Sequence, residues 1–201
     1  MAKPAWYAHT TWSAADREEF LARLRAVAGA HEQAACLRKQ AAHLLKTRSP
    51  ETLIGARELY ELLLAQFPDS SDLAYVHTAL GEVLEASAEE DAGLAAYRAA
   101  LVAQSGTTRS TDAHLRFGLL VIRAGRSELF AEALTLLESS RQPLVYPFDQ
   151  YRHCGIVAHL RGERGETARA RLSARDALAA TKHCAVDAES AFHRRLEELV
   201  K

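Results

Sequence analysis

The sequence predicts an all-α protein in which hairpins of helices stack on one another to form a solenoid. Apolar residues recur at spacings of three and four, as in a helix, and the spacing of two expected for strands is almost missing. A column of small or apolar residues, Leu44, Gly81, Gly118 and Gly155, repeats at a constant offset of 37 positions. A fixed period of roughly 20 to 50 residues is typical of stacked units, each of which buries its apolar face only against a neighbour.

Three further columns share this offset and are again mostly small or apolar: Ala56, Gly93, Phe130 and Thr167; Tyr60, Tyr97, Leu134 and Arg171; and Leu63, Ala100, Leu137 and Ala174. The register defines four helix pairs in residues 31–182 and leaves one helix over at each end. We therefore expect about ten helices in a single solenoid domain, residues 1–201. Residues 1–30 would hold an N-terminal aromatic segment and a capping helix, and residues 183–201 a C-terminal capping helix.

The first expected helix covers residues 14–28. Its apolar side chains form a single stripe, Phe20, Leu21, Leu24 and Val27, and charged residues fill the opposite side. A terminal unit of a solenoid has one face in water instead of against a neighbour, so this composition indicates an N-terminal cap. The last expected helix covers residues 185–200.

The second helix of the first pair has clear start and stop signals. Ser49 is a helix cap, and Pro50 takes the first helical position, where its missing N–H costs no hydrogen bond. Pro68 ends this helix directly after Phe67. The helix should therefore run from residue 50 to about residue 67.

Similar local signals place boundaries in the later pairs. Ser87 and Glu90 have the spacing of a capping box, in which each side chain satisfies a free backbone N–H at a helix start. They predict that the second helix of the second pair begins there. Gly125 and Gly162 predict the turns within the third and fourth pairs.

Charge and cysteine content disfavour several classes of function. The chain carries 25 basic and 26 acidic residues, a net charge of −1, so no overall field attracts nucleic acid or an anionic membrane, and we expect neither partner. No apolar run approaches the roughly 18 residues of a membrane span, and residues 1–15 lack the features of a signal peptide. Cys36, Cys154 and Cys184 form no CxxC pair, which suits a reducing compartment, and we expect a cytoplasmic protein.

The repeat resembles the tetratricopeptide repeat (TPR), a helix pair with a small residue at its eighth position and an Ala, aromatic, Ala, Pro series in its second helix. The matching residues are Ala56, Tyr60, Leu63 and Pro68 in the first pair, and Leu80, Gly81, Leu84, Gly93, Tyr97 and Ala100 in the second. The resemblance covers residues 31–180 and implies a right-handed TPR-like α-solenoid. The period exceeds the family's usual length of about 34 residues, which implies longer helices or turns.

A fainter resemblance rests on the N-terminal residues Trp6, Tyr7, Thr10, Thr11 and Trp12, together with Phe148 and His193. The combination is similar to a group of bacterial TPR-like proteins of unknown function, and it implies no activity. Exposing two tryptophans and a tyrosine to water would be costly. We expect Trp6, Tyr7 and Trp12 to anchor the N terminus, either by sealing the first helix pair or by docking in the solenoid groove.

The TPR resemblance also implies a binding surface. First helices of the family line a concave groove, and their second, fifth, ninth and twelfth positions usually contact a ligand peptide. With Gly81 as the eighth position, these positions also fall on Ala41, Glu85, Ile122 and Asp149, and the residues that we expect to form the partner-binding groove are Arg38, Leu45, Arg48, Tyr75, Thr78, Glu82, Asp112, Leu115, Leu119, Arg152, Ile156 and His159. Apolar centres flanked by both charges are the usual makeup of a protein-binding patch. Leu115, Leu119 and Ile122 are alternatively core residues, because one helical position turns a side chain by roughly 100°.

These observations predict a non-catalytic scaffold that binds another protein or peptide in the groove, as a bacterial regulator, an assembly factor or a toxin-neutralising protein does. We expect no cofactor, no metal and no enzymatic activity, because the chain has no glycine-rich phosphate loop, no HExxH pattern and no strained serine elbow. The absence of Asn argues against the Lys and Asn clamp with which some TPR proteins hold a terminal carboxylate.

A first alternative is a structural homodimer formed through the C-terminal helix. Phe192, Leu196 and Leu199 would then be exposed in the monomer and buried in a two-fold pair.

A second alternative is a metal-binding or enzymatic protein that uses His77 and His114, which share one register position. Gln40 and Tyr151 continue this row. A metal site needs a third and usually a fourth ligand, and neither a Cys nor a carboxylate joins the row. Structural histidines are therefore favoured.

Overall fold

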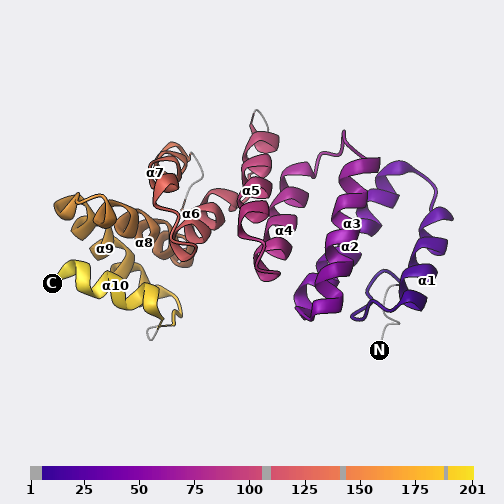
Figure 1. Ribbon diagram of the computed structural model, residues 1–201, viewed down its shortest axis with the longest axis horizontal. Coiled ribbons are helices and arrows are strands. Elements are labelled where there is room, and N and C mark those ends of the chain that lie inside the picture. Colours follow the sequence, from indigo (N-terminus) through magenta and orange to yellow (C-terminus); the bar gives the residue numbers. More distant parts are fainter. Residues whose placement is uncertain (1–5, 106–109, 141–143, 188–189) are drawn as a thin grey trace. The chain divides into compact units, whose positions relative to one another are not determined.

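The computed structural model of the chain describes residues 6–105, 110–140, 144–187 and 190–201, and within these residues the protein is helical and has no strand (Figure 1). The α-helices are α1 (Ala14–Arg25), α2 (Ala30–Thr47), α3 (Pro50–Gln66), α4 (Leu73–Ala86), α5 (Glu90–Gln104), α6 (Ala113–Arg123), α7 (Phe130–Ser139), α8 (Pro147–Glu163), α9 (Thr167–Ala180) and α10 (Ala191–Val200). Short 3₁₀ helices, η1 (Ser127–Leu129) and η2 (Thr181–His183), precede α7 and follow α9. The all-α class and the ten helices predicted from the period are confirmed for the described residues.

The chain divides into two compact units, the N-terminal unit of residues 1–111 and the C-terminal unit of residues 112–201. The N-terminal unit holds α1 to α5, and the C-terminal unit holds α6 to α10. Assignment of residues 1–201 to one solenoid domain stays a prediction.

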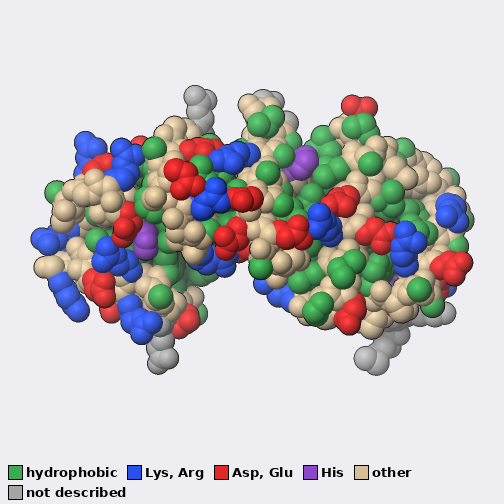
Figure 2. Space-filling model, viewed as in Figure 1, with side chains coloured by type: hydrophobic (Ala, Val, Ile, Leu, Met, Phe, Trp, Pro, Cys, Tyr) green, Lys and Arg blue, Asp and Glu red, His purple; other side chains and the backbone are tan. Residues whose placement is uncertain are grey.

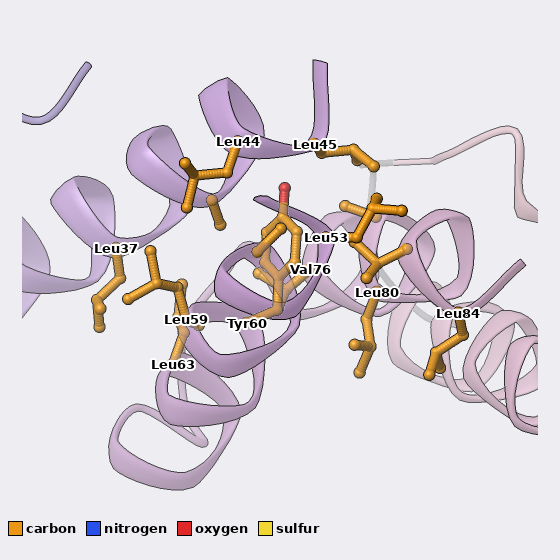
Figure 3. Close-up of a cluster of buried hydrophobic side chains, with 14 of the residues drawn as sticks. Leu37, Leu44, Leu45, Leu53, Leu59, Tyr60, Leu63, Val76, Leu80 and Leu84 are labelled. Carbon is orange, nitrogen blue, oxygen red and sulfur yellow. The ribbon is translucent and has the colours of Figure 1, made fainter. Parts of the chain in front are cut away.

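In the N-terminal unit, α2 packs against α3 and α4 against α5, so each predicted helix pair is a hairpin. Leucine side chains from α2 and α3 form its core, and Leu37, Leu44, Leu59 and Leu63 are almost completely buried. The fully buried ring of Tyr60 lies among them (Figure 3). Burying each leucine stabilises the fold by roughly 1.5–3 kcal/mol, which explains why the apolar columns recur with the repeat.

The start of α3 follows its sequence signals. Ser49 Oγ accepts a hydrogen bond from the Thr52 backbone N–H at 3.3 Å, and the Thr52 hydroxyl accepts one from the Ser49 N–H at 3.0 Å. Pro50 occupies the first turn, and α3 ends at Gln66. The predicted helix is confirmed, with Thr52 completing a capping box that the sequence analysis had not identified.

The capping box predicted from Ser87 and Glu90 is wrong. The Ser87 backbone N–H bonds to the carbonyl oxygens of Val83 and Leu84, so Ser87 closes α4 instead of opening α5. Ala88 then takes a left-handed conformation with φ of 60°, and α5 begins at Glu90 without a side-chain cap. The last carbonyl groups of α4 need hydrogen-bond donors, and Ser87 provides one of them. Ser87 therefore belongs to the end of α4 and does not cap α5.

Of the two predicted turn glycines, Gly125 turns the chain after α6 with φ of 64°. Gly162 instead lies inside α8, and Gly165, with φ of 77°, makes the turn before α9. Gly162 has a packing role, because a Cβ there would lie 3.1 Å from Leu199 Cδ2 of α10. The terminal helices are also shorter than expected: α1 ends at Arg25, and α10 begins at Ala191, after residues 188–189, which lie outside the described residues.

Glycines of the 37-residue column are points of close approach between elements. At Gly81 the ring of Tyr97 occupies the space that a Cβ would need. A Cβ at Gly118 would lie 2.8 Å from Ile156 Cγ2, which is too close for an undisturbed contact. The column therefore repeats because each glycine receives a large side chain from a neighbouring element.

Candidate functional site

The N-terminal unit contains an open hollow of about 780 Å³ between the first helices of its two pairs. Its lining comes from α2, from the residues before and at the start of α4, and from the connection between α5 and α6, and consists of His31, Arg38, Ser71, Asp72, Ala74, Tyr75, Ser110 and Thr111. Arg38 and Tyr75 are two of the groove residues implied by the TPR resemblance. The structure thus brings these two predicted residues together at one concave surface.

Arg38 is the centre of this hollow. Its Nε atom lies 3.2 Å from a carboxylate oxygen of Asp72, and its guanidinium carbon lies 5.4 Å from the centre of the Tyr75 ring. Tyr75 remains 43% exposed, so part of its ring is open to solvent. The ion pair and the cation–π contact hold Arg38 in one orientation while leaving the Tyr75 ring accessible to a partner.

A second hollow, of about 440 Å³, adjoins the first, because His31 and Ser71 line both. Its other walls are mixed, with Ala30, Ala34, Phe67 and Pro68 beside Gln66, Asp69 and Ser70. Together the two hollows offer apolar side chains near Phe67 and polar side chains with both charges around Arg38. This combination suits an extended peptide, whose side chains alternate in character.

The other predicted groove residues of the N-terminal unit are divided between surface and interior. Arg48 is exposed, and Glu82 is half-buried. Leu45 and Thr78 are buried, and the Thr78 hydroxyl donates to the Ala74 carbonyl at 2.7 Å and pairs with the Thr111 hydroxyl at 2.9 Å. Neither Leu45 nor Thr78 presents a side chain to a partner.

In the C-terminal unit, Leu115 is 2% exposed and Ile156 is fully buried against Gly118. Burial therefore corrects the expectation at Leu45, Thr78, Leu115 and Ile156, which lie in the interior. The family positions select one strip of each helix, and a rotation of one position moves part of that strip into the core. Leu119 is partly exposed, and its partner-binding role stays a prediction, as does that of every exposed residue of the set.

Asp112 and Arg152 form an ion pair in the C-terminal unit. Arg152 lies 3.1 Å from Asp112, whose carboxylate also pairs with Arg116 at 3.0 Å, and the Arg152 guanidinium stacks over Phe148 at 5.8 Å. Burial would raise the pKa of Asp112, but the two guanidinium groups outweigh burial and lower the pKa below its ordinary value. Burial lowers the pKa of His159, the last predicted groove residue, and so favours its neutral imidazole.

His31, Ser71 and Asp72 are lining residues that the sequence analysis did not select. They lie outside the four family positions, in the residues that precede or begin the first helices. The charge pair of Arg38 with Asp72 joins α2 to the N-cap of α4, 34 residues later in the sequence, and no local spacing signals such a contact.

The N-terminal aromatic residues seal the first helix pair. The rings of Trp6 and Trp12 lie 5.5 Å and 5.8 Å from the ring of Phe20 in α1, and Trp12 packs on Gly55 of α3. Tyr7 packs against the same core. Of the two placements expected for these residues, the geometry is that of a seal.

The C-terminal helix covers its own unit. Phe192 and Leu196 of α10 fill the space over Gly155, and Leu199 lies over Gly162. Leu196 is completely buried. The dimer surface expected on this helix is thus already occupied within the chain, because the amphipathic stripe of α10 folds back onto α8 instead of waiting for a second copy.

Three members of the row of His77, His114, Gln40 and Tyr151 have separate partners. Gln40 bonds to the backbone of His9, His114 Nε2 lies 3.3 Å from Ser140 Oγ, and the Tyr151 hydroxyl lies 3.2 Å from His193 Nδ1. Burial lowers the pKa of His77. Within the described part of the chain, no group of three or more His, Cys, Asp or Glu side chains is arranged to hold a metal ion.

Charge is mixed on the surface, as the composition predicted. Figure 2 shows acidic and basic side chains interspersed on the visible face of each unit. None of the helices in the described residues combines the length and hydropathy needed to cross a bilayer.

Comparison with known proteins supports the fold. No protein-family model matches the chain, and no curated protein matches it. Among solved structures, the crystal structure of MamA, a TPR-like helical protein, resembles the chain with a TM-score of 0.57 and 14% sequence identity, over 85% of this chain and 96% of that chain. This likeness and the stacked hairpins establish a TPR-like helical fold.

Proposed function

We propose that the protein is a non-catalytic interaction scaffold whose N-terminal unit binds an extended segment of another protein in the hollow around Arg38 and Tyr75. One observation carries the proposal: an exposed tyrosine and a fixed arginine meet at a concave surface formed by two successive first helices. Surfaces of this kind are the functional surfaces of repeat proteins, because stacked units leave a shared face for a partner.

Arg38 and Tyr75 have the properties of interface anchors. Tyrosine and arginine are enriched among the few residues that dominate binding energy. Asp72 already restricts the Arg38 side chain, so little rotamer freedom remains to be lost when a partner docks. The partner would place an apolar side chain near Phe67 and hydrogen-bonding groups near Asp72 and Arg38.

In the C-terminal unit, the surface-accessible members of the predicted set extend the same role. We propose that Leu119, Asp112, Arg152 and His159 contribute secondary contacts there, and that Arg48 and Glu82 do so in the N-terminal unit. Cellular roles compatible with such binding are those of a regulator, an assembly factor or a toxin-neutralising protein in the bacterial cytoplasm. The three cysteines, which are unpaired, suit that compartment.

The test is partner capture followed by measured affinity. A partner recovered from native lysate with the wild-type protein should bind Tyr75→Ala and Arg38→Ala at least about tenfold more weakly in calorimetric titration. Ile54→Ala is the matched control, because Ile54 is 68% exposed on α3 and lines neither hollow. Unchanged affinity for both hollow variants would exclude the hollow as the binding site.

A further inference from the structure

Residues 6–12 lie on α2 and α3 in the manner of a bound peptide. The His9 backbone N–H donates to Gln40 Oε1 at 2.9 Å, and Gln40 Nε2 donates to the His9 carbonyl at 2.9 Å. Gln40 is fully buried beneath this contact. The Gln40 amide thus binds the main chain of His9 through one donor and one acceptor. These two bonds do not depend on which side chain is present at residue 9.

Three side-chain contacts accompany this backbone grip. The indole of Trp12 occupies the space left by the missing side chain of Gly55, and its Nε1–H donates to Glu58 at 3.4 Å. The ammonium group of Lys39 lies 5.0 Å from the centre of the Tyr7 ring. We call the surface formed by Lys39, Gln40, Gly55 and Glu58 the seat.

The seat uses side chains alone to hold the segment. Within the described residues, no backbone–backbone hydrogen bond joins residues 6–12 to α2 or α3. Trp6, Tyr7 and Trp12 are each only partly buried. A repeat helix in the same place would bury a broad apolar face. Residues 6–12 are instead held by the Gln40 amide, by the fit of Trp12 at Gly55 and by partly buried aromatic rings. Such contacts can be made equally well by a segment that arrives from another chain.

The cover over the segment comes from α1. Phe20 packs on both tryptophan rings, and Arg17 donates to Glu58 at 2.7 Å. Asp16 accepts hydrogen bonds from the Thr11 hydroxyl and the Ser13 N–H. The Asp16 bonds tie α1 to the segment, whereas the Arg17 bond ties α1 to Glu58 of the seat, so α1 can stay in place when the segment is displaced.

We propose that the seat is a second peptide-binding site, that residues 6–12 fill it in cis, and that an extended partner segment with two tryptophans separated by five residues binds there by displacement. The site is independent of the hollow on the α4 side of α2, because the seat and the hollow share no residue. Binding at the seat would therefore be regulated by competition with the chain's own N terminus.

The chain offers a direct readout, because both of its tryptophans are in this segment. The full-length double variant Trp6→Ala/Trp12→Ala is free of tryptophan and has a loosened segment. A synthetic peptide of residues 6–13 added to it should show a saturable shift of tryptophan emission to shorter wavelength. A peptide with alanine in place of both tryptophans, carrying a fluorescent label, should bind at least about tenfold more weakly by anisotropy than the labelled native peptide.

Variants of the seat decide whether the peptide binds where its cis counterpart lies. Added to the double variant, Gln40→Leu removes the backbone grip and Gly55→Ala fills the notch, and each should weaken peptide binding about tenfold or more. Ile54→Ala, next to Gly55 in sequence and exposed, should leave binding unchanged.

Circular dichroism establishes that each variant is folded. If the double variant is unfolded, the single variant Trp12→Ala, which retains Trp6 on Phe20, is titrated with the labelled peptide instead. Absence of saturable binding to the folded variant, or binding that neither Gln40→Leu nor Gly55→Ala weakens, overturns the proposal and makes the segment a permanent seal.

Discussion

The two units cover their terminal hairpins with different structural elements. In the N-terminal unit, an irregular aromatic segment and α1 cover α2 and α3, and Trp12 fills the notch at Gly55. In the C-terminal unit, α10 covers α8, and Phe192 fills the notch at Gly155. One closure is thus an irregular segment held by rings and a buried amide, and the other is an amphipathic helix. Both caps place a large aromatic side chain against a glycine. The two units thus share the glycine notch and differ in the secondary structure of the cap.

Removing the largest buried cap residue of each unit should have the largest effect. Phe20→Ala should lower the free energy of unfolding by about 3–5 kcal/mol and Leu196→Ala by about 2–5 kcal/mol, because both side chains are fully buried. Urea titration followed by circular dichroism measures both. Phe20→Ala alone should also change tryptophan emission, since both tryptophans contact Phe20.

The control is Val102→Ala, an exposed position where a change within about 0.5 kcal/mol is expected. A loss below about 1 kcal/mol for Phe20→Ala would show that the aromatic cap contributes little to the N-terminal unit.

Filling the notches should distinguish the two caps. Gly55→Ala places a Cβ inside the indole of Trp12, whereas a Cβ at Gly155 would lie 2.7 Å from Phe192 Cζ, the tip of a ring that can tilt. Overpacking costs about 1–3 kcal/mol, and the higher helix propensity of alanine returns up to about 1 kcal/mol. We expect Gly55→Ala to be the more destabilising of the two in thermal melts. Stabilisation by Gly55→Ala would contradict the tight fit of Trp12.

Two tyrosines of the N-terminal unit, one repeat apart, should respond differently to loss of the hydroxyl. The Tyr97 hydroxyl donates to Glu85 at 2.7 Å, so Tyr97→Phe should cost about 1–2 kcal/mol. The buried Tyr60 hydroxyl has no hydrogen-bond partner among the residues that the structure describes, and burial, with Tyr75 and Glu82 nearby, raises its pKa far above the ordinary value. Tyr60→Phe should be neutral or stabilising in urea titration, and a loss as large as that of Tyr97→Phe would reveal an undetected acceptor.

Acidification should weaken the C-terminal unit through α8. Burial lowers the pKa of His153 and of His159 below the ordinary value, so these imidazoles bind protons more readily in the unfolded chain. Stability is therefore full above the unfolded pKa of about 6.5 and falls as the pH drops below it. Urea midpoints at pH 7.5 and pH 5 measure the loss, which should be the smallest effect considered. His159→Gln should reduce it, and His183→Gln, at an exposed site, should not.

Local signals in the sequence were sufficient for much of the fold. Ser49 and Pro50 start a helix through hydrogen bonds within one turn, so their effect is readable from neighbouring residues. The column of Gly81, Gly118 and Gly155 is readable because a large side chain approaches closely at each of these positions. Ser87 lies between α4 and α5, and its backbone N–H bonds to the end of α4. The prediction at Ser87 was wrong because the sequence pattern does not indicate to which of these two helices the residue belongs.

The site was less predictable, because it depends on which side of each helix faces outward. Arg38 and Tyr75 were found through the family positions, but Leu45 and Ile156, chosen by the same positions, are buried. Asp72 was missed because its contact with Arg38 is a tertiary one. The stripe of α10 was recognised as apolar, yet its partner within the chain was not, since an amphipathic helix looks the same whether it pairs with its own chain or with another.

The glycine column has a consequence for how such a chain can change in length. Ile156 and Phe192 fill the space at Gly118 and Gly155 from about one repeat later in the chain, whereas Tyr97 fills the space at Gly81 from the same hairpin. An inserted or deleted residue inside a helix that carries one of these glycines, or its filling side chain, would turn the two away from each other, because each residue rotates a helix by about 100°. Tolerated length variation should therefore be confined to the connections between helices.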